Sequence, residues 1–258
     1  MNAQQVFIIG CPRSGTSALS WALASHPNMW TSAESDFLHE LFGKARLWES
    51  YSNAYQRPDI GWLKKNNILY KEFASSLGLG VDALFRSRSE GKIWVDSTPS
   101  YTLMATDLAA LFPRAAFLHI VRDGRAVVCS MLKSGFNTDW AKDFKTACDT
   151  WNHYVERGVA FEKENPERVL RVQHRELIES TQEVCQRILA FIGVAHSDSV
   201  AAFLRDHRIN SSYDNQKPED IRSRKDPSSL RSQPWKSWTP EEHRIFEAHS
   251  GDSLRAIG

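Results

Sequence analysis

The stretch VFIIGCPRSGTSALSW, residues 6–21, constrains the fold more than any other part of the chain. Its four apolar residues 6–9 predict a short buried strand, and loop 10–17 leads into a helix that we expect from near Gly15 to Ser25. A strand, a glycine-bearing loop and a helix in this order direct backbone N–H groups and the positive end of the helix dipole at one point. The stretch therefore predicts an anion-binding loop in an α/β fold.

The loop departs from the usual nucleoside triphosphate pattern at one position. Against G-x-x-x-x-G-K-[ST], the chain supplies Gly10 and Gly15, but Thr16 stands where the lysine belongs and Ser17 follows it. A kinase or NTPase needs that lysine and a Mg²⁺ ion beside the β- and γ-phosphates. This loop instead carries its cation at Arg13, with hydroxyl groups at three of the next four positions. It suits a less charged group, such as a phosphosulfate, held without an obligatory metal ion.

A second anion-binding pattern follows the most apolar stretch of the chain. Residues 116–121, AFLHIV, predict a strand of a parallel sheet that is covered on both faces. Arg122 comes directly after this strand, and Ser130 lies eight positions further on, on the expected next helix. A guanidinium group binds phosphate oxygens in pairs, and a hydroxyl adds another hydrogen bond. The two patterns together predict anion sites at the ends of two strands.

Both patterns resemble motifs of one family, the sulfotransferases that use 3′-phosphoadenosine 5′-phosphosulfate (PAPS). PRSGTS, residues 12–17, is similar to their 5′-phosphosulfate loop P-[KR]-[SA]-G-[ST]-[ST], and the arginine-to-serine spacing is similar to their 3′-phosphate motif. The resemblance implies a P-loop-like enzyme that moves a sulfuryl group in line from PAPS to an acceptor hydroxyl or amine, with no metal required. The cofactor-binding residues that it implies are Arg13, Ser14, Gly15, Thr16, Ser17, Arg122 and Ser130.

The resemblance extends to a late polar stretch, 211–238, which has three prolines and no periodicity and which we expect to be a long loop. Its segment LRSQPWK is placed like the family's nucleotide-covering loop, which makes Arg231 a candidate for a second 3′-phosphate contact. A solvated surface loop is the alternative. After the strand expected at 169–172, His174 stands where the family often has a tyrosine near the adenine.

Glu34 is the candidate general base. It follows a short strand expected at 29–31, and loops after parallel strands gather at one edge of a sheet, so Glu34 should lie near Arg13 if the two strands are close neighbours. Glycan and tyrosyl-protein members of the family use a glutamate on the loop after an early strand. A carboxylate is adequate when proton transfer comes late. Arg13 would stabilise charge on the bridging and leaving oxygens, because arginine does not usefully give up a proton.

Other interpretations of these residues stay open. Glu34 is also readable as a loop glutamate in water or at a helix start. His39 and His26 are rival bases, of which His39 is the more serious because it lies about one helical turn from Glu34. His119 lies in the middle of an apolar strand, so we expect a hydrogen-bonded core histidine there.

The rest of the chain predicts one α/β domain over residues 1–258, with about five parallel strands flanked by helices. The remaining strand is expected at 92–96, and turn 97–101 should cap the helix that follows. This turn resembles the family's K-[ST]-P-x-Y, except that Ser97 replaces the lysine. Later helices are expected at 140–158, at 176–192 and after a capping box at 239–242.

Residues 36–90 are rich in aromatic side chains with partial helical spacing. Helices that pack on the sheet are one interpretation. The other is a set of substrate-side helices or a lid, since ligand pockets are often lined by aromatic residues. The two interpretations can hold for different residues.

Composition limits the partners and the compartment. Lys and Arg number 32 against 31 Asp and Glu, so the net charge of +1 does not predict a nucleic-acid partner. The four cysteines are widely spaced, which favours reduced thiols over a disulfide framework or zinc site. The first strand begins within ten residues, leaving no room for a signal peptide, and no apolar run approaches a membrane span. We expect a cytoplasmic protein with no membrane partner.

Two other functions remain as alternatives at this point. A P-loop kinase or NTPase fits the loop apart from its missing lysine, and the apolar residues before Asp96 resemble a Mg²⁺-binding strand. A nucleotide-binding protein without catalysis is the second alternative. The residues do not decide which acceptor a sulfotransferase would use, nor its oligomeric state.

Overall fold

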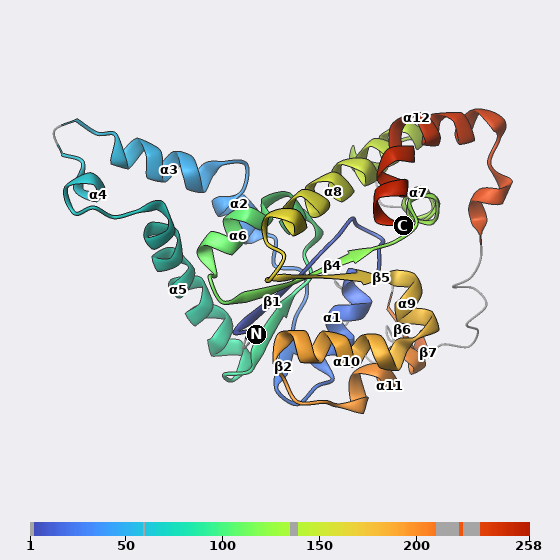
Figure 1. The fold of residues 1–258 in the computed structure, drawn as a ribbon, viewed down its shortest axis with the longest axis horizontal. Helices are drawn as coiled ribbons and strands as arrows, with labels where there is room; N and C mark the ends of the chain where they lie inside the picture. The colour runs from blue at the N-terminus through green and yellow to red at the C-terminus, as the bar shows by residue number, and fades with distance from the viewer. Residues whose placement is uncertain (1–2, 59, 135–138, 210–221, 224–232) are drawn as a thin grey trace.

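A five-stranded parallel sheet forms the centre of the computed structural model, which describes residues 3–58, 60–134, 139–209, 222–223 and 233–258 (Figure 1). The strand order is β2-β3-β1-β4-β5, and each neighbouring pair runs parallel. The predicted fold class, an α/β domain with a five-stranded parallel sheet, is confirmed. The strands are β1 (Gln5–Ile9), β2 (Met29–Thr31), β3 (Ile93–Asp96), β4 (Ala115–Val121) and β5 (Val169–Gln173).

Helices cover both faces of this sheet (Figure 1). The body contains α1 (Thr16–Ala24), η1 (Pro99–Met104), α6 (Ala105–Leu111), α7 (Gly124–Leu132), η2 (Asp139–Ala141), α8 (Phe144–Glu164), α9 (His174–Glu179), α10 (Thr181–Ile192), α11 (Asp198–Asp206), η5 (Pro234–Ser237) and α12 (Pro240–Ile257). Side chains of α1, α10 and α11 pack on one face, and those of α5 (Tyr70–Ser89) and α6 pack on the other.

Strand β1 shows why helices must pack on both faces of the sheet. Successive side chains of a strand point to opposite faces, and all five residues of β1 are buried. Val6 and Ile8 join the cluster with α1 and α10, whereas Phe7 and Ile9 join the cluster with α5 and α6. The Phe7 ring lies 5.3 Å from that of Trp94 and 5.5 Å from that of Phe117. Each such buried ring contributes about 1.5–3 kcal/mol.

A third cluster joins α7, α8 and α12 beyond the end of β4, around the fully buried Trp151. Helix α12 begins with the predicted capping box: the Thr239 hydroxyl accepts from the Glu242 N–H, and the Glu242 carboxylate accepts from the Thr239 N–H. The box satisfies two N–H groups that a helix start otherwise leaves unpaired.

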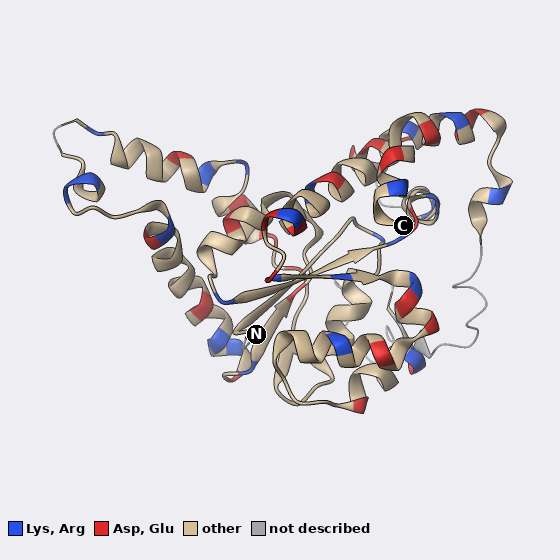
Figure 2. Ribbon diagram, viewed as in Figure 1, with Lys and Arg blue, Asp and Glu red and all other residues tan. Residues whose placement is uncertain are grey.

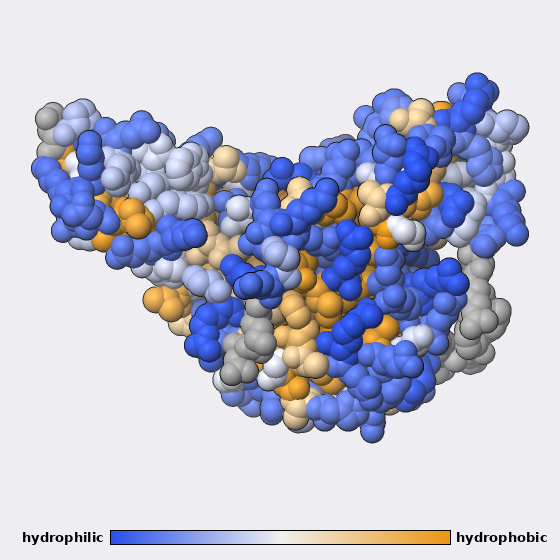
Figure 3. All heavy atoms as spheres, in the orientation of Figure 1, coloured by the Kyte–Doolittle hydropathy of each residue, from blue (hydrophilic) through white to orange (hydrophobic). Residues whose placement is uncertain are grey.

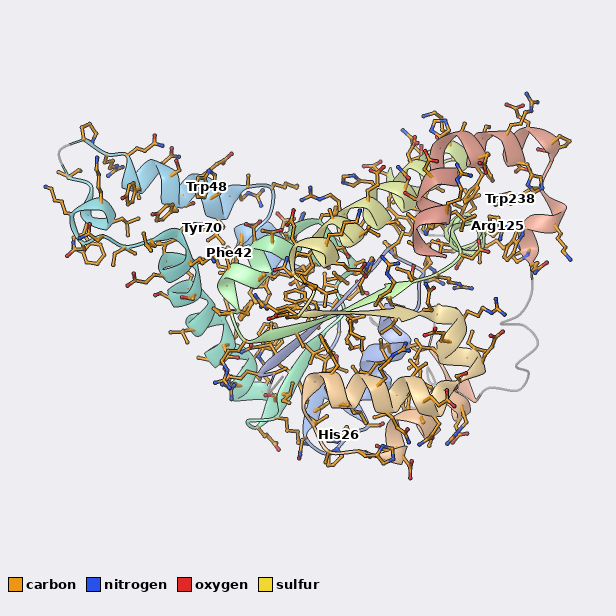
Figure 4. All side chains as sticks on the ribbon, in the orientation of Figure 1. His26, Phe42, Trp48, Tyr70, Arg125 and Trp238 are labelled. Atoms are coloured by element: carbon orange, nitrogen blue, oxygen red, sulfur yellow. The ribbon has the colours of Figure 1, made fainter. Side chains whose placement is uncertain are left out.

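Helices α2 to α5 form an arm that projects from the body on the left of Figure 1. Phe42, Trp48 and Tyr70 lie along it, far from Arg125 on the opposite side (Figure 4). The interpretation as packing helices holds for Leu47 and Phe85, which are core residues. Trp48 and Trp62 are 52% and 65% exposed, and the substrate-side or lid role of this segment stays a prediction. The elements of the arm are α2 (Phe37–Phe42), α3 (Arg46–Tyr55), α4 (Trp62–Lys65) and α5.

Two helix predictions were wrong in their bounds. The helix expected at 140–158 is α8, which begins at Phe144 and runs to Glu164. Gly158 does not end it, because this glycine packs against His119: a Cβ there would lie 2.3 Å from His119 Nε2. The helix expected at 176–192 is divided into α9 and α10 at Ser180, and Gly193 ends it in the left-handed conformation, as expected.

The turn at 97–101 differs from its prediction. Thr98 is the N-cap of η1, which precedes α6, but its hydroxyl donates to the Asp96 carboxylate instead of capping the helix. In the stretch 211–238, expected to be a long loop, β7 (Arg222–Ser223) pairs antiparallel with β6 (His207–Arg208), and η5 follows. Arg231 and most of that stretch lie outside the described residues.

Acidic and basic residues are interspersed over the outer helices (Figure 2). This distribution agrees with the near-zero net charge and shows no face of a single sign in that view. Within the described residues, every helix is too short or too polar to cross a bilayer.

We predict that Gly158→Ala lowers the free energy of unfolding by about 1–3 kcal/mol, because the new methyl group overpacks a buried ring. Gly80→Ala is the matched control. It lies in the same kind of structure, a long helix, with no other atom within 4 Å of its Cβ, so it should stabilise by about 0.5–1 kcal/mol. Urea unfolding of both variants tests the pair, and equal effects would show that His119 does not need this glycine.

Candidate active site

The loop between β1 and α1 depends on two glycines. A Cβ at Gly10 would lie 2.6 Å from the carbonyl oxygen of Ile120, so the loop passes directly against the next strand. Gly15, the N-cap of α1, has φ +100°, in the region that favours glycine. Its Cβ would lie 3.0 Å from Cδ2 of His174. As a glycine, the N-cap of α1 has no side chain with which to cap the first turn, and a helix N-terminus of this kind can bind an anion.

Thr102, on η1, fixes the start of this loop. Its hydroxyl oxygen lies 2.8 Å from the Gly10 nitrogen and 3.1 Å from the Gly10 carbonyl oxygen, so it accepts from one and donates to the other. The side chain is buried, and the contact spans ninety-two residues. Nothing local in the sequence indicated Thr102 as a site residue, because the partner is a backbone group on a distant strand.

Arg13 joins the two predicted anion sites. Its Nε donates to the Ser130 hydroxyl at 3.2 Å, and its backbone carbonyl accepts a 2.9 Å hydrogen bond from Nη1 of Arg122. Its φ of 69° is left-handed, which is uncommon for a residue with a side chain. The structure therefore brings Arg13, Arg122 and Ser130 together from the ends of β1 and β4 and from α7.

Glu34 lies within electrostatic reach of Arg13. The strands that carry them are not neighbours, since β3 lies between β1 and β2, but the loops after these strands still converge. Burial lowers the pKa of Arg13, and the Glu34 carboxylate opposes this shift by favouring the charged guanidinium. Burial also raises the pKa of Tyr154 on α8, and Asp36 and Glu34 are among the charges that raise it further. Tyr154 packs against the cluster of α7, α8 and α12, within electrostatic reach of the loop that carries Glu34.

A cavity of about 420 Å³ lies beside the phosphate loop. Arg122 and His174 line it, and His174 also contacts Gly15, so the cavity and the loop are adjacent. On its other side, the Arg125 guanidinium is 4.7 Å from the centre of the Trp235 ring and is held by the Asp123 carboxylate. Arg125 points toward the segment before α12 (Figure 4). The cavity offers cationic and aromatic groups, which suit a phosphorylated ring system.

The sulfotransferase family model matches residues 5–198, which include both motifs and Glu34. This chain belongs to the sulfotransferase family. The membership confirms the predicted family and decides against the kinase or NTPase alternative.

Curated relatives of this sulfotransferase include tyrosine-modifying enzymes. A candidate protein-tyrosine sulfotransferase of Caenorhabditis briggsae is 23% identical over 98% of this chain and 85% of its own length. Protein-tyrosine sulfotransferase 1 of Danio rerio is 24% identical over 76% of this chain, which spans only 54% of that relative. The chain therefore spans about half the length of several curated relatives that it matches.

Solved structures show the same fold. The sulfotransferase domain of the Synechococcus PCC 7002 olefin synthase superposes with a TM-score of 0.58 at 20% identity, covering 95% of this chain and 93% of that domain. Mouse sulfotransferase SULT7A1, solved in complex with PAP, has a TM-score of 0.55 at 15% identity, covering 98% of this chain and 84% of that one.

The three histidines considered in the sequence lie in different environments. His119 is a hydrogen-bonded core residue as predicted, because its Nδ1 lies 2.7 Å from Glu162. His26 is also structural: its Nδ1 accepts from the Asn28 N–H, so Nε2 carries the proton and donates to a carbonyl. It lies at the bottom of Figure 4, near α10 and α11. His39 lies on α2, 4.0 Å from the Glu40 carboxylate.

Ser97, which follows β3 directly, is buried. Arg231 lies outside the described residues, so its predicted role stays a prediction. The described residues contain no group of three or more His, Cys, Asp or Glu side chains that could hold a metal ion.

We predict that Thr102→Val lowers the free energy of unfolding by about 1–3 kcal/mol, because it leaves the buried N–H and carbonyl of Gly10 without their partner. Thr102→Ser keeps the hydroxyl and should retain most of the stability. Denaturant unfolding of the two variants tests the role, and equal losses would assign the effect to packing alone.

Proposed function

We propose that this protein transfers a sulfuryl group from PAPS to the hydroxyl, or the amine, of an acceptor. The observation that carries the proposal is the contact between the two anion-binding motifs, in which Arg122 donates to the Arg13 carbonyl and Arg13 donates to Ser130. A nucleotide with anionic groups at both ends needs two such sites close together. The family membership and the PAP complex of a protein with the same fold support the same assignment.

The nucleotide contacts follow from the loop and the cavity. PAPS supplies the activated sulfuryl group. In this proposal, the N–H and hydroxyl groups of residues 14–17 hold the 5′-phosphosulfate, and Arg122 and Ser130 hold the 3′-phosphate. Arg231 is proposed as a second 3′-phosphate contact, because the segment that follows it supplies Gln233 and Trp235 to the cavity that Arg122 lines.

Arg13 and Glu34 carry the transfer step. The buried guanidinium of Arg13 stabilises negative charge on the bridging and leaving oxygens, and it does so more strongly because water is partly excluded there. Glu34 takes the proton of the acceptor as the bond to sulfur forms. Its nearness to Arg13 supports this role, since both groups must reach the same sulfuryl group.

The proposal also covers the class of acceptor and the cellular location of the protein. Named relatives modify protein tyrosines, so a tyrosine peptide is the first acceptor to test, beside phenols, lipid alcohols and sugars. Radiolabelled PAPS with each acceptor class gives the test. We place the protein in the cytoplasm, and its four buried free cysteines support a reducing compartment.

We predict that the desulfated product, 3′-phosphoadenosine 5′-phosphate (PAP), raises the melting temperature without Mg²⁺, and that ATP does so much less. At about 100 times its Kd, PAP stabilises by about 2.7 kcal/mol. For a domain of this size this corresponds to a rise of about 5–10 °C. Thermal denaturation with micromolar PAP measures the shift.

Arg122→Ala should abolish this shift because it removes the proposed 3′-phosphate contact. Arg187→Ala removes an exposed arginine of α10 that pairs with Glu176 and does not line the cavity, so it should leave the shift unchanged. Equal responses of the native protein to PAP and ATP would count against the proposed function.

We predict that Glu34→Gln retains the PAP-induced melting shift but slows sulfuryl transfer by about 100-fold or more, because general-base catalysis contributes about 10² to 10⁴ in rate. The control is Glu40→Gln, an exposed glutamate on the next helix. Transfer rates with radiolabelled PAPS decide the matter. If Glu34→Gln transfers at the native rate, the base has been misassigned, and His39→Asn becomes the variant to measure.

A further inference from the structure

A closed hydrogen-bond network lies next to Glu34, between the loop after β2 and the turn after β3. Asp96, at the end of β3, is only 5% exposed and accepts three hydrogen bonds. Its Oδ1 accepts from the N–H of Thr98 at 2.9 Å and from the Thr98 hydroxyl at 2.7 Å. Its Oδ2 accepts from the Ser35 hydroxyl at 2.6 Å. Three contacts to one buried carboxylate fix its position.

Ser35 is held by its backbone and by its side chain. Its N–H donates to the Thr98 hydroxyl oxygen at 3.0 Å, and its own hydroxyl lies between Asp96 and the hydroxyl of Tyr101, 2.6 Å from each. Because Ser35 gives its only hydroxyl proton to the Asp96 carboxylate, Tyr101 must donate to Ser35. The contacts form a closed ring through Ser35, Thr98 and Asp96, with Tyr101 as its outer donor.

The residues on either side of Ser35 show what the ring holds. Glu34 precedes it and lies within electrostatic reach of Arg13. Asp36 follows it with φ +46° and ψ −33°, a left-handed backbone that side-chain-bearing residues rarely adopt. Such a conformation persists where its surroundings determine it. The loop therefore turns sharply at Asp36, and Ser35 is the point where it is tied to β3.

We propose that Ser35, Asp96, Thr98 and Tyr101 form a positioning clamp that holds Glu34 beside Arg13 for the transfer step. The inference rests on the proposed function, since it concerns the geometry of the proposed base. The clamp residues bond to one another and hold Ser35, the residue next to Glu34, and the four do not line the cavity beside Arg122, so in this proposal they act through Glu34.

The clamp also gives the turn after β3 a role that its position alone did not show. Thr98 and Tyr101 are the serine/threonine and tyrosine positions of the K-[ST]-P-x-Y resemblance, and both are buried. Here they act on a neighbouring loop instead of on the helix that follows.

The test is a double-mutant cycle between Ser35→Ala and Glu34→Gln. Ser35→Ala removes the side-chain half of the tie, and misplacing a catalytic group by about 1 Å costs up to about 100-fold in rate. We expect kcat to fall by about 10-fold to 100-fold, with the PAP-induced melting shift unchanged. In the Glu34→Gln background, Ser35→Ala should have little further effect, because the group that it positions is already gone.

Two variants control for structural damage. Ser32→Ala removes a hydroxyl from the same loop that bonds only to the neighbouring Ala33 carbonyl among its described contacts, and it should transfer at the native rate. Ser35→Thr keeps the hydroxyl and should restore most of the lost rate. Rates are measured with radiolabelled PAPS, both as sulfate released to water and as transfer to a tyrosine peptide.

The outcomes separate the two proposals. A protein that binds PAP but consumes no PAPS overturns the proposed function and the clamp's role with it. The clamp alone is overturned if the protein transfers sulfuryl groups and Glu34→Gln slows the transfer, but Ser35→Ala lowers the rate by the same factor in the native and in the Glu34→Gln background. A Ser35→Ala variant with native kcat also overturns the clamp.

Discussion

The hydrogen bond from the Arg122 guanidinium to the Arg13 carbonyl is the contact on which the arrangement of the site depends. It ties the loop after β1 to the end of β4, and the bond from Arg13 to Ser130 adds α7 to the same junction. Because β1 and β4 are fully buried and are hydrogen-bonded neighbours, both ends of this contact are held firmly. The proposed nucleotide site is therefore organised by the sheet and not by the outer helices.

Much of this site could be predicted from local patterns. The two motifs and the parallel sheet could be predicted from Gly10, Gly15 and the apolar run before Arg122, because such patterns follow from backbone geometry alone. Thr102 and the clamp around Ser35 could not be predicted in the same way. Thr102 bonds to a partner 92 residues away and Ser35 to partners 61 to 66 residues away, and their local sequence is that of an ordinary turn or helix.

The errors at helix ends have the same origin. Gly158 was expected to end its helix, yet it lies inside α8. A side chain at this position would collide with the ring of His119. The turn at 97–101 was expected to cap the next helix, yet the Thr98 hydroxyl donates to the buried carboxylate of Asp96. In both cases a tertiary contact overrides the local preference.

The arm of α2 to α5 borders a broad hollow in the upper outline of the molecule, with α8 and α12 on the other side (Figure 3). Its outer helices α3 and α4 are short, and Trp48, Ile60 and Trp62 stay more than half exposed. Segments with few buried contacts open locally at a small fraction of the global unfolding free energy. Backbone amides of α4, which contains no buried residue, should accordingly exchange with deuterium well before those of β1 and β4, and we expect this end of the arm to change shape while the sheet stays folded.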